Sequence, residues 1–256
     1  IFVGDMGGQV WRFKINNDNK GAGNDLASGR IFASVAGSNE ASARRFYTEP
    51  AVALLSANNK VSLTVSLGSG YRGHPLDKVI QDRFYSFRSE ELNNLGTVTL
   101  GESDLYNATS LVTATDAQRE ALLQKNGWYI TLAANGEKVL SNTMAIGGTL
   151  YFNTYQPVVA QNACRATLGI SRGYRVNLLD GTAKEQSRFT VLKGATLPSN
   201  PQVYCKGDTC WAYNDPSQLV SWGNTGGGGN TGGGKPDPHD LASKSRLYWT
   251  DKSEEK

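Results

Sequence analysis

The chain has 256 residues, of which 39% are hydrophobic and 9% aromatic, so it is long enough and apolar enough to fold around a packed core. Its formal net charge of +3 argues against a nucleic-acid-binding protein, since those carry a clustered basic face. No apolar run approaches the roughly 20 residues of a membrane-spanning helix, so direct membrane insertion is not expected.

The first elements in the chain have the patterns of β-strands. Residues 1–5 and 9–15 are apolar strands joined by a turn at Gly7-Gly8, so the sequence begins in what reads as the middle of a sheet. A later stretch, KVSLTVSLGSG, alternates apolar and polar residues, the period of a half-buried strand. Its apolar face is formed by Val61, Leu63, Val65 and Leu67.

The segment INNDNKGAGND, residues 15–25, has some features of a calcium-binding loop. Such a loop needs oxygen ligands at regular positions, and Lys20 stands at one of them. We therefore interpret this segment as a polar hairpin loop and expect no calcium site and no other cofactor in this sequence.

One segment, TDAQREALLQKNG, has the pattern of a short helix. Thr115 is placed as the N-cap and Gln118 follows three residues later, the spacing of a capping box. Gly127 is placed where a glycine commonly follows the last turn. The sequence therefore predicts one short helix inserted among strands.

The region after this helix, residues 127–155, predicts an antiparallel meander. Its Asn135-Gly136 pair is a strong signal for a type I′ hairpin, and Gly147-Gly148 supplies a second tight turn. Four shorter strands follow, at residues 173–181, 187–194, 202–205 and 210–213.

The strand pattern predicts an all-β protein with a propeller-like repetition. An apolar strand, a Gly-rich turn and an aromatic/Arg strand recur around Trp11, Phe84-Tyr85 and Tyr174. At four strands per blade, about fourteen strands make about three to four blades, fewer than most closed propellers contain. We therefore interpret residues 1–222 as the C-terminal portion of a modified β-propeller, entered in the middle of a blade.

The C-terminal region has a different composition. Residues 223–240 form a Gly-rich flexible tether of roughly 20–25 Å root-mean-square span. Residues 241–256 combine a closing strand with a charged tail. The strand is expected to add to a sheet edge, either in this chain or in a partner, through Arg246, Leu247, Tyr248 and Trp249.

The cysteines suggest an exported protein. Cys205 and Cys210 flank a four-residue turn-rich loop, so paired strands on either side would bring them within bridging distance. A disulfide between them indicates an oxidising compartment; the alternative is two free thiols in a cytosolic protein. Cys164 has no partner in this pairing, and a cysteine upstream of residue 1 is the candidate.

No catalytic constellation is evident in the sequence. The two histidines, His74 and His239, lie in a Gly/Pro-containing loop and in the tether, where we interpret them as surface residues rather than catalysts. The acidic residues Glu49, Glu137 and Asp180 are isolated, and salt bridges or caps explain them better than a glycosidase-type acid pair. We therefore expect no catalytic and no metal-binding residues.

Several motifs, taken together, resemble one protein family. IFVGDMGGQVWRFKI (residues 1–15) resembles the (V/I)-x-x-G-D-x-x-G-x-x-W-R-F-D strand pair of the C-terminal domain of PilC/PilY-type proteins, the type IV pilus tip-associated assembly factors and adhesins. The terminal SRLYWTD is similar to the closing R-x-x-W-R strand of the family, although Thr250 stands where an arginine is common. Further resemblances follow in the expected order, at residues 48–53, 67–89 and 126–181.

The resemblance implies a modified β-propeller that is exported to the cell surface or pilus tip and passes the periplasm or outer membrane in transit. It implies a non-enzymatic domain that interacts with minor pilins, supports pilus biogenesis and contributes to adhesion to a host surface or glycan. Two alternatives come from the propeller pattern itself: a quinoprotein-like oxidoreductase and a carbohydrate-binding propeller. The family's calcium loop has no counterpart in these residues, so what the resemblance implies for calcium is a possible site upstream of residue 1.

Overall fold

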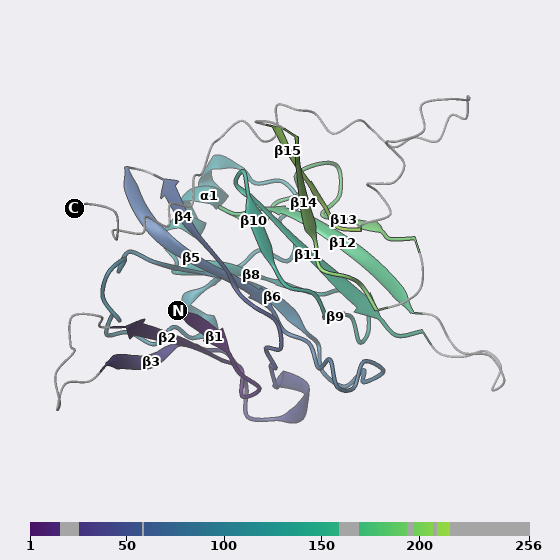
Figure 1. The fold of residues 1–256 in the computed structure, drawn as a ribbon, viewed down its shortest axis with the longest axis horizontal. Helices are drawn as coiled ribbons and strands as arrows, with labels where there is room; N and C mark the ends of the chain where they lie inside the picture. The colour runs from purple at the N-terminus through teal and green to yellow at the C-terminus, as the bar shows by residue number, and fades with distance from the viewer. Residues whose placement is uncertain (16–25, 58, 159–168, 194–196, 207–208, 216–256) are drawn as a thin grey trace.

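The computed structural model describes residues 1–15, 26–57, 59–158, 169–193, 197–206 and 209–215. This part of the chain is mostly β-structure arranged in several sheets, as the sequence predicts (Figure 1). Its helices are one α-helix, α1 (Asp116–Leu123), and the short 3-10 helices Glu40–Ser42 and Glu102–Asp104. None of the described helices has the length and apolar character needed to cross a membrane.

Three sheets make up the body of the molecule. The first is antiparallel, in the order β1 (Phe2–Gly4), β2 (Gln9–Ile15), β3 (Ala27–Ser34). The central sheet has the order β4 (Ala51–Ala57), β5 (Lys60–Gly68), β6 (Arg83–Ser89), β8 (Gly127–Thr131), β7 (Tyr106–Asn107), and its β7–β8 pair is parallel. The third has the order β10 (Met144–Ile146), β11 (Thr149–Gln156), β12 (Ile170–Asn177), β13 (Phe189–Val191), with β9 (Lys138–Val139) also paired to β11.

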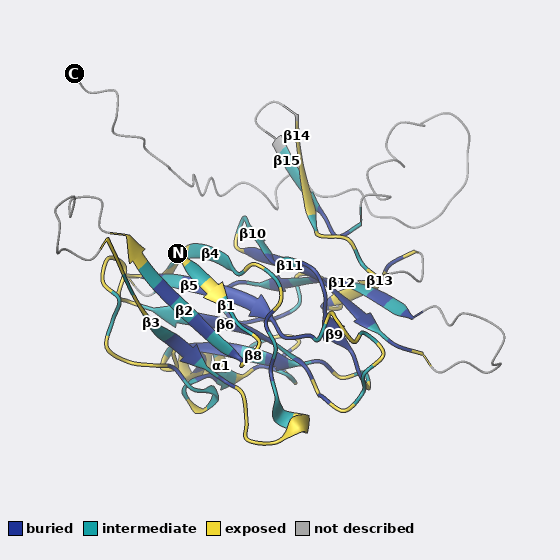
Figure 2. Ribbon diagram, turned by 60° about the horizontal axis from the view of Figure 1, so that its bottom comes forward, coloured by how far each residue is buried: buried dark blue, intermediate teal, exposed yellow. Residues whose placement is uncertain are grey.

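The central sheet is covered on both faces, which places two apolar layers in the core. Along β6, Tyr85 and Phe87 join the layer shared with the first sheet, whereas Phe84 joins the layer shared with the third sheet. The period of two in a strand explains this division. The buried colour of β6, β8, β11 and β12 marks these layers in Figure 2.

This arrangement corrects the expectation that residues 60–68 form a half-buried strand. Val65 and Leu67 are fully buried as predicted, but Val61 on the same face is 48% exposed. The polar residues of the other face, Ser62, Thr64 and Ser66, are buried as well. Thr64 donates its hydroxyl hydrogen bond to the Ala53 carbonyl oxygen, and the hydroxyls of Ser66 and Ser86 bond to each other at 2.9 Å. Short hydroxyl side chains can turn inward here because neighbouring strands supply their partners.

The predicted turns have different outcomes. Gly147-Gly148 closes the β10–β11 hairpin, with positive φ at both glycines and a register that pairs Ile146 with Thr149. The type I′ hairpin at Asn135-Gly136 is wrong: of the pair, only Gly136 has a positive φ, and β8 and β9 belong to different sheets. The turn moves the chain from the central sheet to the third sheet, so the predicted meander is broken there.

The helix begins where the sequence predicts but ends earlier. The Thr115 hydroxyl accepts a hydrogen bond from the Gln118 amide, and the Gln118 side-chain oxygen accepts one from the Thr115 amide, completing the capping box. Gly127, predicted to end the helix, is instead the first residue of β8, with φ +126°. A Cβ there would lie 2.1 Å from the Ser86 carbonyl oxygen, so strand pairing explains this glycine.

A two-stranded hairpin, β14 (Gln202–Lys206) and β15 (Thr209–Tyr213), forms a separate ribbon beyond the third sheet (Figure 2). Its base is fixed by Asn214, which is buried against β11 and β12. The Asn214 amide donates to the Tyr174 carbonyl oxygen and the Asn153 side-chain oxygen, and Asn153 donates back to the Asn214 carbonyl oxygen. This amide pair attaches the hairpin to the body.

Candidate functional site

The structure shows the predicted disulfide. Cys205 and Cys210 face each other across the β14–β15 hairpin, with a Cα–Cα distance of 4.0 Å, and their sulfurs are bonded. Other sequence-predicted features lie outside the described residues: Cys164, most of the 15–25 loop, the 223–240 tether and the strand formed by Arg246, Leu247, Tyr248 and Trp249. Within the described ranges, no group of three or more His, Cys, Asp or Glu side chains could hold a metal ion.

The first resemblance motif, GDMGGQVWRF, organises the β1–β2 turn. The Asp5 carboxylate accepts hydrogen bonds from the amides of Gly7 and Gln9 and from the Trp11 indole, at 2.8–2.9 Å. Gly8 at φ +76° completes the turn. Every polar atom that makes this motif recognisable is therefore occupied within the fold.

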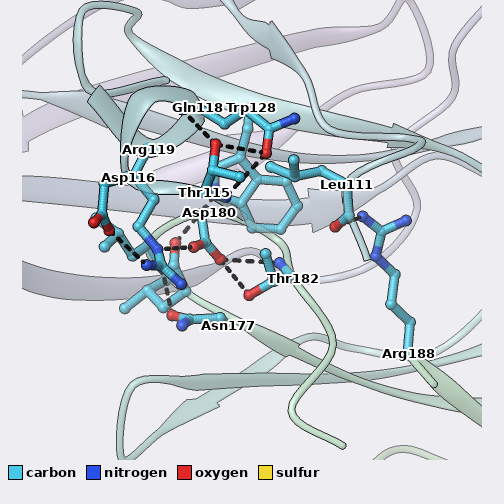
Figure 3. Close-up of polar contacts among 12 residues, drawn as sticks. Leu111, Thr115, Asp116, Gln118, Arg119, Trp128, Asn177, Asp180, Thr182 and Arg188 are labelled. Carbon is cyan, nitrogen blue, oxygen red and sulfur yellow. Dashed lines mark hydrogen bonds and ion pairs between the residues drawn. The ribbon is translucent and has the colours of Figure 1, made fainter. Parts of the chain in front are cut away.

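The motif VNLLDG has a similar structural role beside α1. Asp180 is fully buried, accepts from the Thr182 amide and hydroxyl and pairs with the Arg119 guanidinium at 3.2 Å. Trp128 donates its indole hydrogen bond to the Leu178 carbonyl oxygen on the same turn. Figure 3 shows these contacts joining the helix, β8 and the end of β12.

Arg188 completes this junction from the other side. Its guanidinium is buried and donates to the carbonyl oxygens of Ala108, Thr109, Leu111 and Gly181. Burial lowers the pKa of Arg188 from its ordinary value, because few charges compensate the loss of water. The residue stabilises loops that have no strand partners, which is a structural function.

A buried carboxylate, that of Glu137, also lies within the third sheet, directly before β9. Glu137 accepts hydrogen bonds from the Thr154 and Tyr174 hydroxyls at 2.7 and 2.9 Å, and Arg172 lies 3.6 Å away. Burial, followed by the nearby Glu137 charge, raises the pKa of Tyr174. The sequence-level expectation that Glu137 and Asp180 serve as structural acids agrees with these contacts.

Segment 67–89 has two buried ends that belong to the core. The Ser69 hydroxyl donates to the Asp82 carboxylate at 2.6 Å, and both residues are almost fully buried. Burial raises the pKa of Asp82 to about 6, although the Ser69 hydrogen bond and the Lys138 and Arg44 cations act in the opposite direction. The ends of the segment therefore close one end of the β5–β6 pair.

Lys138 is a second buried charge beside this carboxylate, with only 1% of its surface exposed. Its ammonium donates to three carbonyl oxygens, those of Pro75, Asp77 and Gly136, at 3.0, 2.7 and 2.6 Å. Burial lowers the pKa of Lys138, and the nearby Asp82 charge opposes that shift. The cation thus fastens loop 75–77 to β9.

The middle of the segment differs from its ends in burial, because its aromatic side chains are partly or fully exposed. Tyr71 stacks with Tyr47 and with His74, each at 6.1 Å between ring centroids and within 26° of parallel, and the Arg45 guanidinium lies 4.5 Å from the Tyr71 centroid. Tyr47 is 45% exposed and His74 is also exposed. We call these four side chains, Arg45, Tyr47, Tyr71 and His74, the Tyr71 cluster.

Several hydrogen bonds hold the loops that carry the cluster. The Gly70 amide donates to the Arg45 carbonyl oxygen at 2.9 Å, and the His74 amide donates to the Tyr71 carbonyl oxygen at 3.1 Å. Arg72 donates to the Leu140 carbonyl oxygen at 2.9 Å. Together with Lys138 below, these contacts fix a set of exposed rings, an arrangement suited to binding because little order must be gained.

The polar ends of the cluster have no partners among the described residues. Neither the hydroxyls of Tyr47 and Tyr71 nor the His74 imidazole makes a hydrogen bond there, and Arg45 makes no ion pair. The motif residues above have their polar groups occupied within the fold. The Tyr71 cluster is therefore the candidate functional site.

A hollow elsewhere on the surface offers a weaker candidate. It has a volume of about 470 Å³ and lies where Phe32, Arg88, Glu90 and Val98 approach the end of α1. Its main charges are already used, since Arg88 donates to carbonyl oxygens at the helix end and Glu90 pairs with Lys60. We assign no ligand to it.

Comparison with known proteins supports the fold. No protein-family model matches the sequence, and no curated protein matches it either. Among solved structures, the chain is similar to the crystal structure of the Pseudomonas aeruginosa PilY1 C-terminal domain, with a TM-score of 0.54 and 15% identity. The likeness shows a PilY1-like fold. The match covers 84% of this chain and 55% of that one, so the chain spans about half the length of that domain.

The PilY1-like fold agrees with the resemblance that the sequence motifs indicate, but sequence reasoning missed the cluster itself. It treated His74 as an isolated surface residue and did not connect it with Tyr47. A usable signal was present: RRFYTEP and GYRGHP both place arginine beside aromatic residues outside any alternating strand pattern. Phe46 in the first stretch belongs to the core, whereas Tyr47 and Tyr71 belong to neither core cluster.

Proposed function

We propose that this chain is a non-enzymatic interaction domain of a type IV pilus tip complex, which contacts minor pilins and supports pilus assembly. The observation that carries the proposal is the PilY1-like fold over 84% of the chain. The order of the sequence motifs adds support, because the turns at Asp5 and Asp180 that they specify are formed.

The proposal includes a propeller architecture. The first and third sheets pack on opposite faces of the central sheet, with one apolar layer on each side of it, as neighbouring blades do in a propeller. On this reading the central sheet is one blade and the first and third sheets belong to its neighbours. Further blades would come from residues outside this sequence.

The proposed location is the cell surface or pilus tip, reached by export. The Cys205–Cys210 disulfide supports it, because such bonds persist in oxidising compartments. The hairpin that carries the disulfide is largely exposed, so the cytosolic reducing systems would reach the bond if the protein remained inside the cell.

The test is a deletion in a piliated bacterium that carries the gene. Removing codons 1–215 should abolish surface pili in a shearing assay and abolish twitching motility, and a plasmid copy of the intact gene should restore both. Normal piliation and twitching in cells that lack the segment would refute the pilus function.

The oxidoreductase alternative makes a different prediction. A quinoprotein would show new visible absorbance when pyrroloquinoline quinone and calcium are added to the purified protein, whereas an interaction domain would not. The carbohydrate-binding alternative is favoured by one specific observation, the exposed aromatic rings of the Tyr71 cluster.

A further inference from the structure

The Tyr71 cluster combines ring faces with a cation. Aromatic faces carry partial negative charge, so they attract the polarised C–H groups on the flat side of a sugar ring. The Arg45 guanidinium over Tyr71 can form two parallel hydrogen bonds with a carboxylate. The Tyr47 and Tyr71 hydroxyls can exchange hydrogen bonds with sugar hydroxyls, since they have no partners among the described residues.

The cation of the cluster is available to a ligand. Arg45 makes no ion pair among the described residues, and Arg72 on the same pair of loops donates to the Leu140 carbonyl oxygen. The nearby Asp77 carboxylate accepts from the Val79 amide at 2.9 Å, and Glu49 accepts from the Asn142 side chain. A carboxylate on a ligand would therefore bind at the Arg45 guanidinium.

From this combination we infer that the Tyr71 cluster is a binding subsite for an acidic saccharide, a sugar that carries a carboxylate. The sugar ring stacks on the exposed Tyr47 ring, and its carboxylate binds Arg45, whose guanidinium lies over the Tyr71 ring. A protein interface usually needs about 20–30 residues from each partner. Four side chains from two fixed loops match the size of one or two sugar rings better.

Gly73 leaves the space that this subsite requires. A Cβ at Gly73 would lie 3.1 Å from the Tyr71 ring and 3.4 Å from the Tyr47 hydroxyl. The missing side chain keeps the junction between these two rings open. The inference stands apart from the pilus function, because it rests on the cluster alone and would hold in any exported protein with this surface.

The experiment measures binding of trisaccharides to the purified protein by saturation-transfer NMR and calorimetry. The probes are oligomers of galacturonic acid, of N-acetylneuraminic acid and of neutral galactose. We expect at least one acidic oligomer to bind at least tenfold more tightly than the neutral one. Tyr71→Ala should reduce that affinity at least tenfold, and Arg45→Met should remove the preference for the acidic oligomer.

The control is Tyr204→Ala, which removes a tyrosine of the β14–β15 hairpin that is 50% exposed, close to the 45% of Tyr47. Its affinity should equal that of the unmodified protein, and thermal unfolding should show that all variants are folded. The inference is overturned if neither acidic oligomer binds, if the neutral oligomer binds equally well, or if Tyr204→Ala loses as much affinity as Tyr71→Ala. Capture of a protein partner through this cluster without saccharide binding also overturns it.

Discussion

The polar side chains of segment 67–89 lie in two different environments. At its ends, Ser69 and Asp82 are almost fully buried and hydrogen-bonded to each other. In its middle, Tyr71 stacks on Tyr47 of a neighbouring loop and on His74, and the side-chain polar atoms of Tyr71 and His74 bond to no described residue. The same short segment therefore contributes to both the core and the surface.

The difference separates residues that serve the fold from residues that are available to a ligand. A buried polar group is expensive unless the protein satisfies it, so its removal should change the free energy of unfolding. An exposed ring with unpaired polar atoms contributes little to that free energy, so its removal should change binding instead. Removal of the buried charges should therefore lower the free energy of unfolding most, and opening the exposed hairpin should lower it least.

The largest expected effect follows replacement of Lys138 by methionine. The variant keeps the side chain's length but leaves three carbonyl oxygens without a donor and Asp82 without its nearby cation. The free energy of unfolding should fall by about 3–5 kcal/mol in urea denaturation. Lys60→Met is the control, because the Lys60–Glu90 pair is largely exposed and should contribute less than about 1 kcal/mol. Equal losses of unfolding free energy in both variants would contradict the distinction between buried and exposed charges.

A second test replaces Asp180, and its control replaces Asp116, which pairs with the same arginine, Arg119. Asp180→Ala removes the buried partner of Arg119 and the acceptor for the Thr182 amide and hydroxyl, so the unfolding free energy should fall by about 2–4 kcal/mol. Asp116 pairs with the same guanidinium but is fully exposed, so Asp116→Asn should leave the denaturation midpoint nearly unchanged. A larger loss in the Asp116 variant would contradict the assignment shown in Figure 3.

Asp82 makes the stability depend on pH. Because its pKa is raised to about 6 in the folded protein, the folded state binds this proton more tightly than the unfolded chain. The resulting contribution is fully present below about pH 4 and is lost as the pH rises through about 6. Relative to Asp82→Asn, the unmodified protein should lose roughly 2–3 kcal/mol of unfolding free energy between pH 4 and pH 7.5. Stability curves that run parallel over this range would show that Asp82 does not titrate as described.

The smallest effect is expected for the disulfide. Cys205→Ser with Cys210→Ser opens a short loop at the end of an exposed hairpin, so the unfolding free energy should fall by less than about 2 kcal/mol. Mass spectrometry of the unmodified protein should show that neither thiol reacts with an alkylating reagent until a reductant is added. Reaction of both thiols without reductant would refute the bond.

Much of the local structure could be predicted from sequence. The Thr115 capping box and the Gly147-Gly148 turn need only neighbouring residues, and both are formed. Asn135-Gly136 shows that the chain turns but not which sheet receives the next strand, so the hairpin prediction failed there. The half-buried reading of residues 60–68 failed for a related reason, since only the three-dimensional arrangement shows that a second sheet covers the serine and threonine face.

The candidate site was less predictable than the fold. Tyr47 and Tyr71 are far apart in the sequence, and no local pattern shows that their rings meet. The sequence around Lys138 has the pattern of an ordinary strand, although the Lys138 ammonium is buried against loop 75–77. The disulfide could be predicted because both cysteines lie within one hairpin, where the separation along the chain sets the separation in space.

The contacts of Lys138 determine the solution conditions under which loop 75–77 keeps its shape. Three inward-facing carbonyl oxygens form the kind of oxygen cage in which proteins often hold a dissolved cation. Here the positive charge is covalently part of the chain. A chelator such as EDTA cannot extract it, and its occupancy does not vary with the concentration of ions outside the cell.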